Sequence, residues 1–416
     1  MRAGFYTIIA AQFFSSVADN ALLIAAIGLL GEIAAPAWMT PALKQVFVVS
    51  YVVLAPLVGP FADSMPKGRV MLITNMVKIV GCAVMLTGAH PLLAYAVVGL
   101  GAAAYSPAKY GILTELLPSE QLVLANGWME GATVASIVLG FVLAGVLISP
   151  AVSETLLRFD MPFVDTGVDT ASSAAVALLI VVYFIAAVFN WFIPNTGVDH
   201  RTPSLKPMYL LREFVHCLAL LWRDRLGQIT LAATTLSWGA AATLQFIVLE
   251  WGSRVLGLPM QRSLFMMGVV IIGMAAGVTA AARWVSLRGA VRVLPAGVLM
   301  GVLTICMVLV HRLPTALVLM VLIGACGGFF VVPMNALLQH RGHVLMGAGH
   351  SIAVQNFNEN LGILVMVGLY ALMLHAGASI TTAIVLYGLF VVAIVVLIML
   401  RHRYNQRRAD SLRPIR

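Results

Sequence analysis

The sequence predicts an all-α polytopic membrane protein with twelve transmembrane helices in two six-helix bundles. Of its 416 residues, 61% are hydrophobic and only 10% are charged, and the mean hydropathy is +0.99. A soluble protein of this length needs far more polar surface. Apolar runs long enough to cross a bilayer as a helix, which takes about 20 residues, recur along the whole chain.

Polar breaks divide the chain into twelve apolar runs, six before and six after a charged stretch between Asn195 and Arg225. The first run contains Asp19 and is too long for a cleaved signal peptide, so it is predicted to be the first span. The predicted spans are 5–33, 43–62, 70–88, 91–116, 121–148, 172–194, 228–252, 262–284, 291–310, 314–339, 346–375 and 378–400. The predicted domains are an N-terminal bundle (1–194), a cytoplasmic linker (195–227), a C-terminal bundle (228–400) and a basic cytoplasmic tail (401–416).

The basic residues predict which side of the membrane each loop faces. With both termini in the cytoplasm, eighteen Lys and Arg residues in loops and tails lie on the cytoplasmic side. The opposite side holds five, namely Lys44, Arg158, Arg254, Arg262 and Arg312. Positive residues concentrate in cytoplasmic loops, so both termini are predicted to be cytoplasmic. The net charge of +9 therefore reflects topology and needs no nucleic-acid partner.

Cysteine spacing excludes several site classes. The four cysteines, Cys82, Cys217, Cys306 and Cys326, form no C-x-x-C or Cys/His pattern. We interpret them as small apolar packing residues, and the sequence predicts neither a metal site nor a cofactor. The chain also contains no His-x-x-x-x-Asp pair and no Gly-x-Ser-x-Gly motif, which argues against a membrane acyltransferase or another enzyme.

Six charged residues lie well inside the predicted spans: Asp19, Lys78, Lys109, Glu130, Glu250 and Glu359. Intramembrane charges usually face a bundle interior or a cavity and pair with one another. Asp19 and the adjacent Asn20 are candidate substrate-binding residues, and the alternative is a structural hydrogen bond between helices. For Lys78 and Glu250, structural pairing or snorkelling to the interface is the favoured interpretation.

Lys109 follows Pro107 in the fourth predicted span. Tyr105 precedes Lys109 by one helical turn, so the two side chains share a face. A lysine is a compact charge suited to a phosphate or a carboxylate, and we expect it to meet substrate phosphate or an internal partner such as Asp19. The alternative is a lysine that snorkels to the cytoplasmic headgroups.

Two further spans carry polar stripes. Asn126, Glu130 and Thr133 share one face of the fifth span. In the eleventh span, polar residues occupy more than one face, which a lipid-facing helix could not carry. These residues are Gln355, Asn356, Asn358, Glu359 and Asn360. Glu130, Gln355, Asn356 and Glu359 are therefore candidate substrate-binding residues.

The loop after the second span contains Asp63, Lys67, Gly68 and Arg69. Together with the predicted 6+6 arrangement, it resembles the signature loop of the major facilitator superfamily, although Gly68 lies farther from Asp63 than in the usual pattern. The resemblance implies a gating role for Asp63, Lys67 and Arg69. A plain solvated turn with positive-inside residues is the alternative.

Several longer stretches are similar to the bacterial lysophospholipid transporter family of that superfamily. They are "AQFFSSVADNALL" (11–23), "FADSMPKGRVM" (61–71), "GAAAYSPAKYGILTELL" (101–117), "ANGWMEGAT" (125–133), "GGFFVVPMNALLQHRG" (327–342) and "GAGHSIAVQNFNEN" (347–360). The family pattern has a basic residue in the seventh span where this chain has Gln245. Gln245 is kept as a candidate substrate-binding residue, and an arginine contact to phosphate from that span is in doubt.

The resemblance implies a transporter that moves lysophospholipids, such as lysophosphatidylethanolamine, from the outer to the inner leaflet of the bacterial inner membrane. It also implies a functional partner, an acyltransferase/acyl-carrier-protein synthetase that reacylates the imported lipid. We expect contacts with membrane lipids and a monomer. The alternative function is an ion-coupled exporter of drugs or small solutes, with Asp19, Glu130 or Glu359 as the proton site.

Overall fold

A computed structural model describes residues 3–36, 39–149, 152, 154–155, 168–198, 206–258 and 260–410. Within them, eleven helices are long and apolar enough to cross a membrane, and a bent pair forms a twelfth if it is counted as one span. Several charged residues used to predict topology lie outside the described residues: Arg2, Arg158, Asp160, Asp165, Arg201, Arg413 and Arg416.

The first half of the chain folds into eight α-helices among the described residues. They are α1 (Ala3–Glu32), α2 (Met39–Val53), α3 (Ala55–Asp63), α4 (Lys67–Leu86), α5 (Pro91–Leu116), α6 (Leu122–Ile148), α8 (Ala171–Trp191) and α9 (Pro207–Arg223), with a short 3-10 helix at Ser119–Gln121 before α6. Helix α9 lies inside the predicted linker, where no helix was expected.

The second half adds six α-helices. They are α10 (Gly227–Arg254), α11 (Met260–Trp284), α12 (Leu294–Cys306), α13 (Leu313–Met346), α14 (Ala348–His375) and α15 (Ile380–Asp410), and 3-10 segments flank α12 at Leu287–Val293 and Met307–Leu309. Helix α15 runs ten residues past the predicted end of the last span, so the first part of the predicted tail is helical.

Local chemistry explains several helix boundaries. Thr170 and Ser173 form a reciprocal capping box that begins α8. The predicted second span is bent by 63° between α2 and α3, where Pro56 follows the break. A single residue, Gly347 (φ +89°), separates α13 from α14, and glycine adopts this left-handed conformation without a steric penalty.

The chain divides into two compact units. Unit 1 comprises residues 1–116, 132–215 and 346–354, and unit 2 comprises 117–131, 216–345 and 355–416. Helices α6, α9 and α14 therefore each contribute residues to both units.

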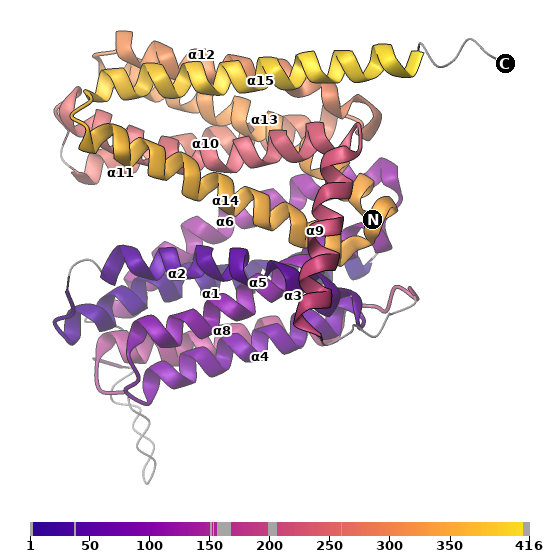
Figure 1. Ribbon diagram of the computed structural model, residues 1–416. Coiled ribbons are helices and arrows are strands. Elements are labelled where there is room, and N and C mark those ends of the chain that lie inside the picture. The colour runs from indigo at the N-terminus through magenta and orange to yellow at the C-terminus, as the bar shows by residue number, and fades with distance from the viewer. Residues whose placement is uncertain are drawn as a thin grey trace. The chain divides into compact units, whose positions relative to one another are not determined.

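Unit 1 is built on α1, α4, α5 and α8. Helix α4 packs against α5 and α8, and α1 packs against α8 (Figure 1). Their apolar core includes Leu22, Leu30, Tyr95 and Leu179. Asp19 lies on α1 within this bundle.

Unit 2 contains an unusually close helix pair. A methyl group added at Gly273 or Gly277 of α11 would meet the carbonyl oxygens of Val321 and Ala325 on α13. Small residues allow such close approach of two membrane helices. The larger core of this unit includes Trp251, Met320, Phe330 and Tyr387.

Candidate functional site

A buried charged cluster of unit 1 centres on Asp19 of α1 and Lys78 of α4. The Lys78 ammonium donates to both Asp19 oxygens, at 2.9 and 2.8 Å, and to Ser15 Oγ at 3.0 Å. The Lys78 side chain is 1% exposed, whereas that of Asp19 is 20% exposed. One member of the pair is thus sealed in the bundle, and the other remains partly open.

Aromatic and polar side chains hold this pair in place. The Tyr183 hydroxyl of α8 donates to Asp19 Oδ1 at 2.7 Å. The Lys78 ammonium lies 4.9 Å from the centre of the buried Tyr105 ring, where a cation–π interaction is favourable. Ser15 donates to Asn75 Oδ1 at 2.9 Å. Four helices, α1, α4, α5 and α8, therefore converge on one ion pair.

The expected pairing of Asp19 with Lys109 is not what the structure shows, because Lys78 occupies the position beside the carboxylate. Lys109 is half-buried on α5, with its ammonium 4.4 Å from the Tyr110 ring centre. The physical reason is position along the helix: Tyr105 faces Lys78, and Lys109 lies one turn farther along α5 on the same face. For Lys78, the predicted structural pairing is confirmed and snorkelling is wrong, because its almost fully buried side chain pairs with Asp19.

Asn20 points away from this cluster. Its amide donates to the Ser16 carbonyl of its own helix at 2.8 Å. Gln12, also on α1, donates to Thr133 of α6 at 2.9 Å, and Ser16 donates to Gln12 at 3.2 Å. These contacts form a second, neutral polar strip between α1 and α6.

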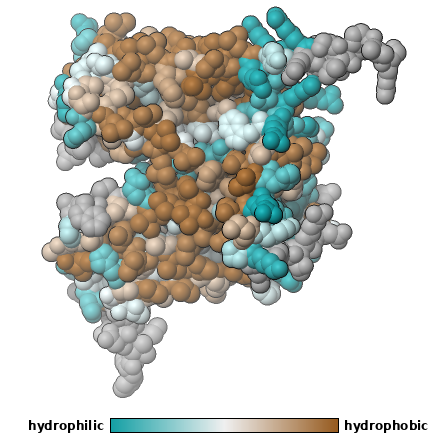
Figure 2. Space-filling model, viewed as in Figure 1, coloured by the Kyte–Doolittle hydropathy of each residue, from teal (hydrophilic) through white to brown (hydrophobic). Residues whose placement is uncertain are grey.

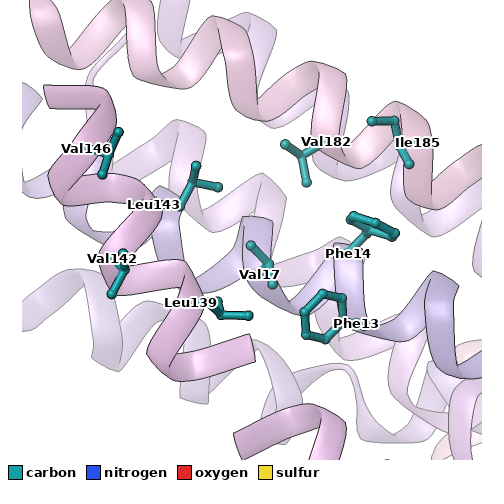
Figure 3. Close-up of a pocket in the computed structure, with 9 residues that line it drawn as sticks. All are labelled: Phe13, Phe14, Val17, Leu139, Val142, Leu143, Val146, Val182 and Ile185. Atoms are coloured by element: carbon teal, nitrogen blue, oxygen red, sulfur yellow. The ribbon is translucent and has the colours of Figure 1, made fainter. Parts of the chain in front are cut away.

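An apolar pocket of about 350 Å³ opens in unit 1 on the side of α1 that carries Phe13, Phe14 and Val17 (Figure 3). The other lining residues are Leu139, Val142, Leu143 and Val146 of α6 and Val182 and Ile185 of α8. The helical spacing puts Phe13 and Val17 on roughly the opposite face from Ser15 and Asp19. Helix α1 therefore separates a charged cluster from an apolar pocket.

Two of the predicted gating residues, Asp63 and Lys67, lie in a second charged cluster in unit 1. Asp63, the last residue of α3, accepts hydrogen bonds from the backbone N–H groups of Gly349 and His350 at 2.8 and 3.2 Å. Lys67 contacts Asp63 at 2.6 Å, and His350 Nδ1 lies 2.7 Å from the other carboxylate oxygen. A carboxylate at a helix N-terminus satisfies unpaired N–H groups and interacts favourably with the helix dipole. Asp63 thus holds the first turn of α14.

The sequence did not predict three residues of this cluster, namely Glu115, Glu213 and His350. Glu115 lies 3.4 Å from the buried Lys67 ammonium, and Glu213 of α9 lies 3.7 Å from His350 Nε2. Arg69, predicted alongside Asp63 and Lys67, is instead exposed. The glycine-rich "GAGH" (347–350) at the start of the eleventh span was the available signal for His350, since it resembles the start of a helix that binds an anion.

The polar stripes of the fifth and eleventh spans meet in unit 2. The Asn335 amide of α13 donates to Glu130 of α6 at 3.4 Å, and Gln355 of α14 donates to Asn335 at 3.1 Å and to Glu359 at 2.7 Å. All four side chains are less than 9% exposed. Two buried carboxylates are thus joined through two amides.

Two further candidates from the sequence are Gln245 and Asn356. Gln245 is half-buried on α10, and no hydrogen bond connects it to Glu130 or Glu359 in the described part of the protein. Asn356 is buried on α14, and its backbone carbonyl accepts from Asn360. Asn335, which was not selected from the sequence, is the residue that joins the two carboxylate-bearing helices.

Comparison with solved structures identifies the fold. The human organic anion transporter MFSD10 (TETRAN) aligns with a TM-score of 0.73 at 16% identity, covering 96% of this chain and 100% of that chain. The transporter FucP in its outward conformation aligns with a TM-score of 0.74 at 13% identity, covering 97% and 98%. At such low identity the likeness concerns the fold alone, and it confirms the predicted all-α transporter architecture.

Sequence comparison identifies the family to which the chain belongs. The model of the Major Facilitator Superfamily matches residues 8–366. The lysophospholipid transporter LplT of Yersinia enterocolitica is 42% identical over 381 residues, which is 91% of this chain and 89% of the relative. That of Yersinia pestis is 43% identical over 374 residues, or 90% and 87%. The chain is a multi-pass membrane transporter of the Major Facilitator Superfamily and belongs, within it, to the LplT family.

Proposed function

We propose that this protein moves lysophospholipids, such as lysophosphatidylethanolamine, from the outer to the inner leaflet of the bacterial inner membrane. The observation that carries the proposal is the identity of 42–43% with lysophospholipid transporters over about nine-tenths of the chain. A match of that extent covers most of the chain, so the substrate class of the relatives is the best hypothesis for this chain.

The arrangement around α1 supports an amphiphilic substrate. A lysophospholipid has one acyl tail and a charged headgroup, and exposing the tail to water costs about 0.8 kcal/mol per CH₂. The Phe13–Phe14–Val17 face lines an apolar pocket, and Asp19 lies on the other side of the same helix. The tail can therefore remain in apolar surroundings while the headgroup is handled by polar side chains.

Two charged side chains match the two charges of a zwitterionic headgroup. Phosphoethanolamine carries an ammonium and a phosphate, and Asp19 and Lys109 carry the opposite charges. Asp19 is the partly exposed member of its pair with Lys78, so its carboxylate can accept the substrate ammonium while Lys78 stays in contact with it. Lys109, one turn beyond Tyr105 on α5, is the candidate contact for the phosphate.

The same proposal includes the cellular setting. Both termini face the cytoplasm, the protein works as a monomer, and the imported lipid is reacylated by a partner acyltransferase/acyl-carrier-protein synthetase. The excess of basic residues in the predicted cytoplasmic loops supports this orientation. Reporter fusions at the C-terminus test it directly: a periplasmic signal there would overturn the topology.

A reconstituted flip assay tests the substrate class. The purified chain in proteoliposomes should move fluorescent lysophosphatidylethanolamine between leaflets, and Lys109→Ala should abolish the movement without loss of folded protein. Unlabelled lysophosphatidylethanolamine should compete, whereas glycerophosphoethanolamine, which lacks the tail, should compete poorly. Strong competition by the tailless compound would contradict a lipid carrier.

One observation favours the alternative, an ion-coupled exporter. Glu130 and Glu359 are buried carboxylates linked through Asn335 and Gln355, an arrangement that suits a shared proton. If this function is correct, transport should depend on an imposed pH gradient and Glu359→Gln should remove that dependence. Lipid movement that is equal with and without the gradient would exclude it.

A further inference from the structure

Helix α9 has a strongly one-sided distribution of apolar residues. Leu210, Phe214, Cys217 and Leu221 are each at most 7% exposed. Their spacing of three and four residues places them on one face, which packs against the protein. This face explains how α9 is held against the protein, but most of the apolar residues of the helix lie outside it.

A second line of apolar side chains on α9 is exposed. Met208, Leu211, Val215 and Trp222 are 70%, 47%, 53% and 42% exposed. Their spacing of three, four and seven residues places them on one line, about a quarter turn around the helix from the buried face. A contiguous line of large exposed apolar side chains indicates an apolar partner.

Basic residues border this line on the side away from the buried face. Arg212, His216 and Arg223 are exposed and lie at spacings of four and seven. Around the helix, the order is therefore buried face, exposed apolar line, basic border. An amphipathic helix in a membrane interface has the same order, because its apolar side enters the acyl boundary while its basic residues meet anionic headgroups.

The attachment of α9 to α10 keeps it near a membrane boundary. Only three residues separate Arg223 from Gly227, where the membrane-spanning helix α10 begins. Fully extended, three residues reach only about 10 Å. Asp224 fixes this turn, since it accepts from the Gly227 N–H at 2.8 Å and from Arg341 at 2.7 and 2.9 Å. Helix α9 runs across the direction of α10 rather than continuing it (Figure 1).

We propose that α9 is an interfacial helix that docks on the anionic surface of the cytoplasmic leaflet. Met208, Leu211 and Val215 enter the acyl boundary, and Arg212 and Arg223 contact lipid phosphates. The basic border beside the apolar line favours an anionic lipid surface over a second protein as the occupant. Figure 2 shows hydrophilic residues gathered where α9 runs, next to the apolar surface of the spans.

Docking would have a consequence within unit 1. Glu213 of α9 lies 3.7 Å from His350 Nε2, and His350 Nδ1 lies 2.7 Å from Asp63. The position of α9 therefore sets the position of a carboxylate next to the side chain that contacts Asp63. In this way, lipid charge at the membrane surface acts on the cluster that holds the start of α14.

Neighbouring positions on α9 provide a matched test. The full chain, with its four native cysteines replaced, carries an environment-sensitive fluorophore at Val215→Cys or at His216→Cys. It is reconstituted in vesicles of phosphatidylcholine alone or of phosphatidylcholine mixed with phosphatidylglycerol. Lipids spin-labelled at the top of the acyl chain should quench the label at 215 and spare the one at 216, whereas aqueous iodide should do the reverse. Both positions are exposed and adjacent, so position along the helix cannot produce the difference.

The charge requirement is tested by a second variant. Phosphatidylglycerol should increase quenching by lipid at 215, and Arg212→Gln with Arg223→Gln should remove that increase. Elution at the wild-type size shows that each variant is folded. The proposal is overturned if iodide quenches both labels equally, which places the face in water. It is also overturned if the label at 215 is shielded from both quenchers, which indicates a protein contact, or if phosphatidylglycerol has no effect.

Discussion

Neutralising one member of the Asp19–Lys78 pair should destabilise the protein more than neutralising both. Lys78→Met and Asp19→Asn preserve shape closely, so the loss of charge is the main change. Breaking a buried ion pair typically costs about 3–5 kcal/mol, because the remaining charge is left in an apolar setting.

The two single variants should lose different amounts of unfolding free energy. After Lys78→Met, the Asp19 carboxylate keeps the Tyr183 hydroxyl and is 20% exposed, so the expected loss is about 3 kcal/mol, near the lower end of that range. After Asp19→Asn, the Lys78 ammonium is 1% exposed and keeps the Ser15 hydroxyl and the Tyr105 ring, so the expected loss is about 4–5 kcal/mol. The double variant buries no unpaired charge and should lie within about 1–2 kcal/mol of the wild type.

Reversible unfolding in mixed micelles, followed by tryptophan fluorescence, measures these free energies. The double variant should remain folded in proteoliposomes yet move no lysolipid, because the Asp19 carboxylate that is proposed to meet the substrate ammonium is gone. Losses that simply add in the double variant would refute the pairing. Normal transport by the double variant would instead refute the role of the pair in substrate handling.

Three further perturbations have definite expected outcomes. Gly277→Val should lower the free energy of unfolding by about 2–3 kcal/mol, because the new Cβ would meet the Ala325 carbonyl. Gly268→Val on the same helix has open space and should change it by no more than about 0.5 kcal/mol. Equal thermal shifts of the two variants would contradict the close α11–α13 contact. Asp63→Asn should remove about 1 kcal/mol of stabilisation from the start of α14 and speed hydrogen exchange at Gly349, and unchanged exchange would argue against the cap. Burial raises the pKa of the Asp224 carboxyl, but hydrogen bonds from Arg341 and the Gly227 N–H outweigh it and hold the pKa below 3.8. The stabilisation relative to Asp224→Asn should thus be fully present above pH 3.8 and lost as the pH falls through the lower folded-state pKa, and a difference that persists in stronger acid would contradict it.

Span positions were accessible from the sequence because membrane helices carry a strong local signal. The fourth predicted span, 91–116, coincides with α5 (Pro91–Leu116), and Pro107 lies inside that helix without ending it. Helix α9 was missed because charged residues marked its region as a linker. The three- and four-residue spacing of Leu210, Phe214, Cys217 and Leu221 was the signal that could have found it.

The pairing of these charges could not be predicted from the sequence in the same way. The sequence identifies Asp19, Lys78 and Lys109 as intramembrane charges. Which lysine pairs with Asp19 depends on how α4 and α5 are positioned against α1. Contacts such as Asp63 with His350 join positions 287 residues apart, and no local pattern encodes them. The family resemblance indicated the substrate class. Arguments from single residues left it open whether the protein is a lipid carrier or an exporter of small solutes.

The separation of Asp19 from Lys78 along the chain has a consequence for biogenesis. The two residues are 59 positions apart, and α1 is synthesised first. At about 5–20 residues per second, Lys78 leaves the ribosome roughly 3 to 12 seconds after Asp19. During that interval α1 must enter the membrane with its acid unpaired, at a cost of about 3 kcal/mol for an aspartate at the helix centre. The apolar residues on either side of Asp19, from Ile8 to Leu30, must therefore be sufficient by themselves to insert the helix, and their hydrophobicity is fixed by the order of synthesis as well as by the finished fold.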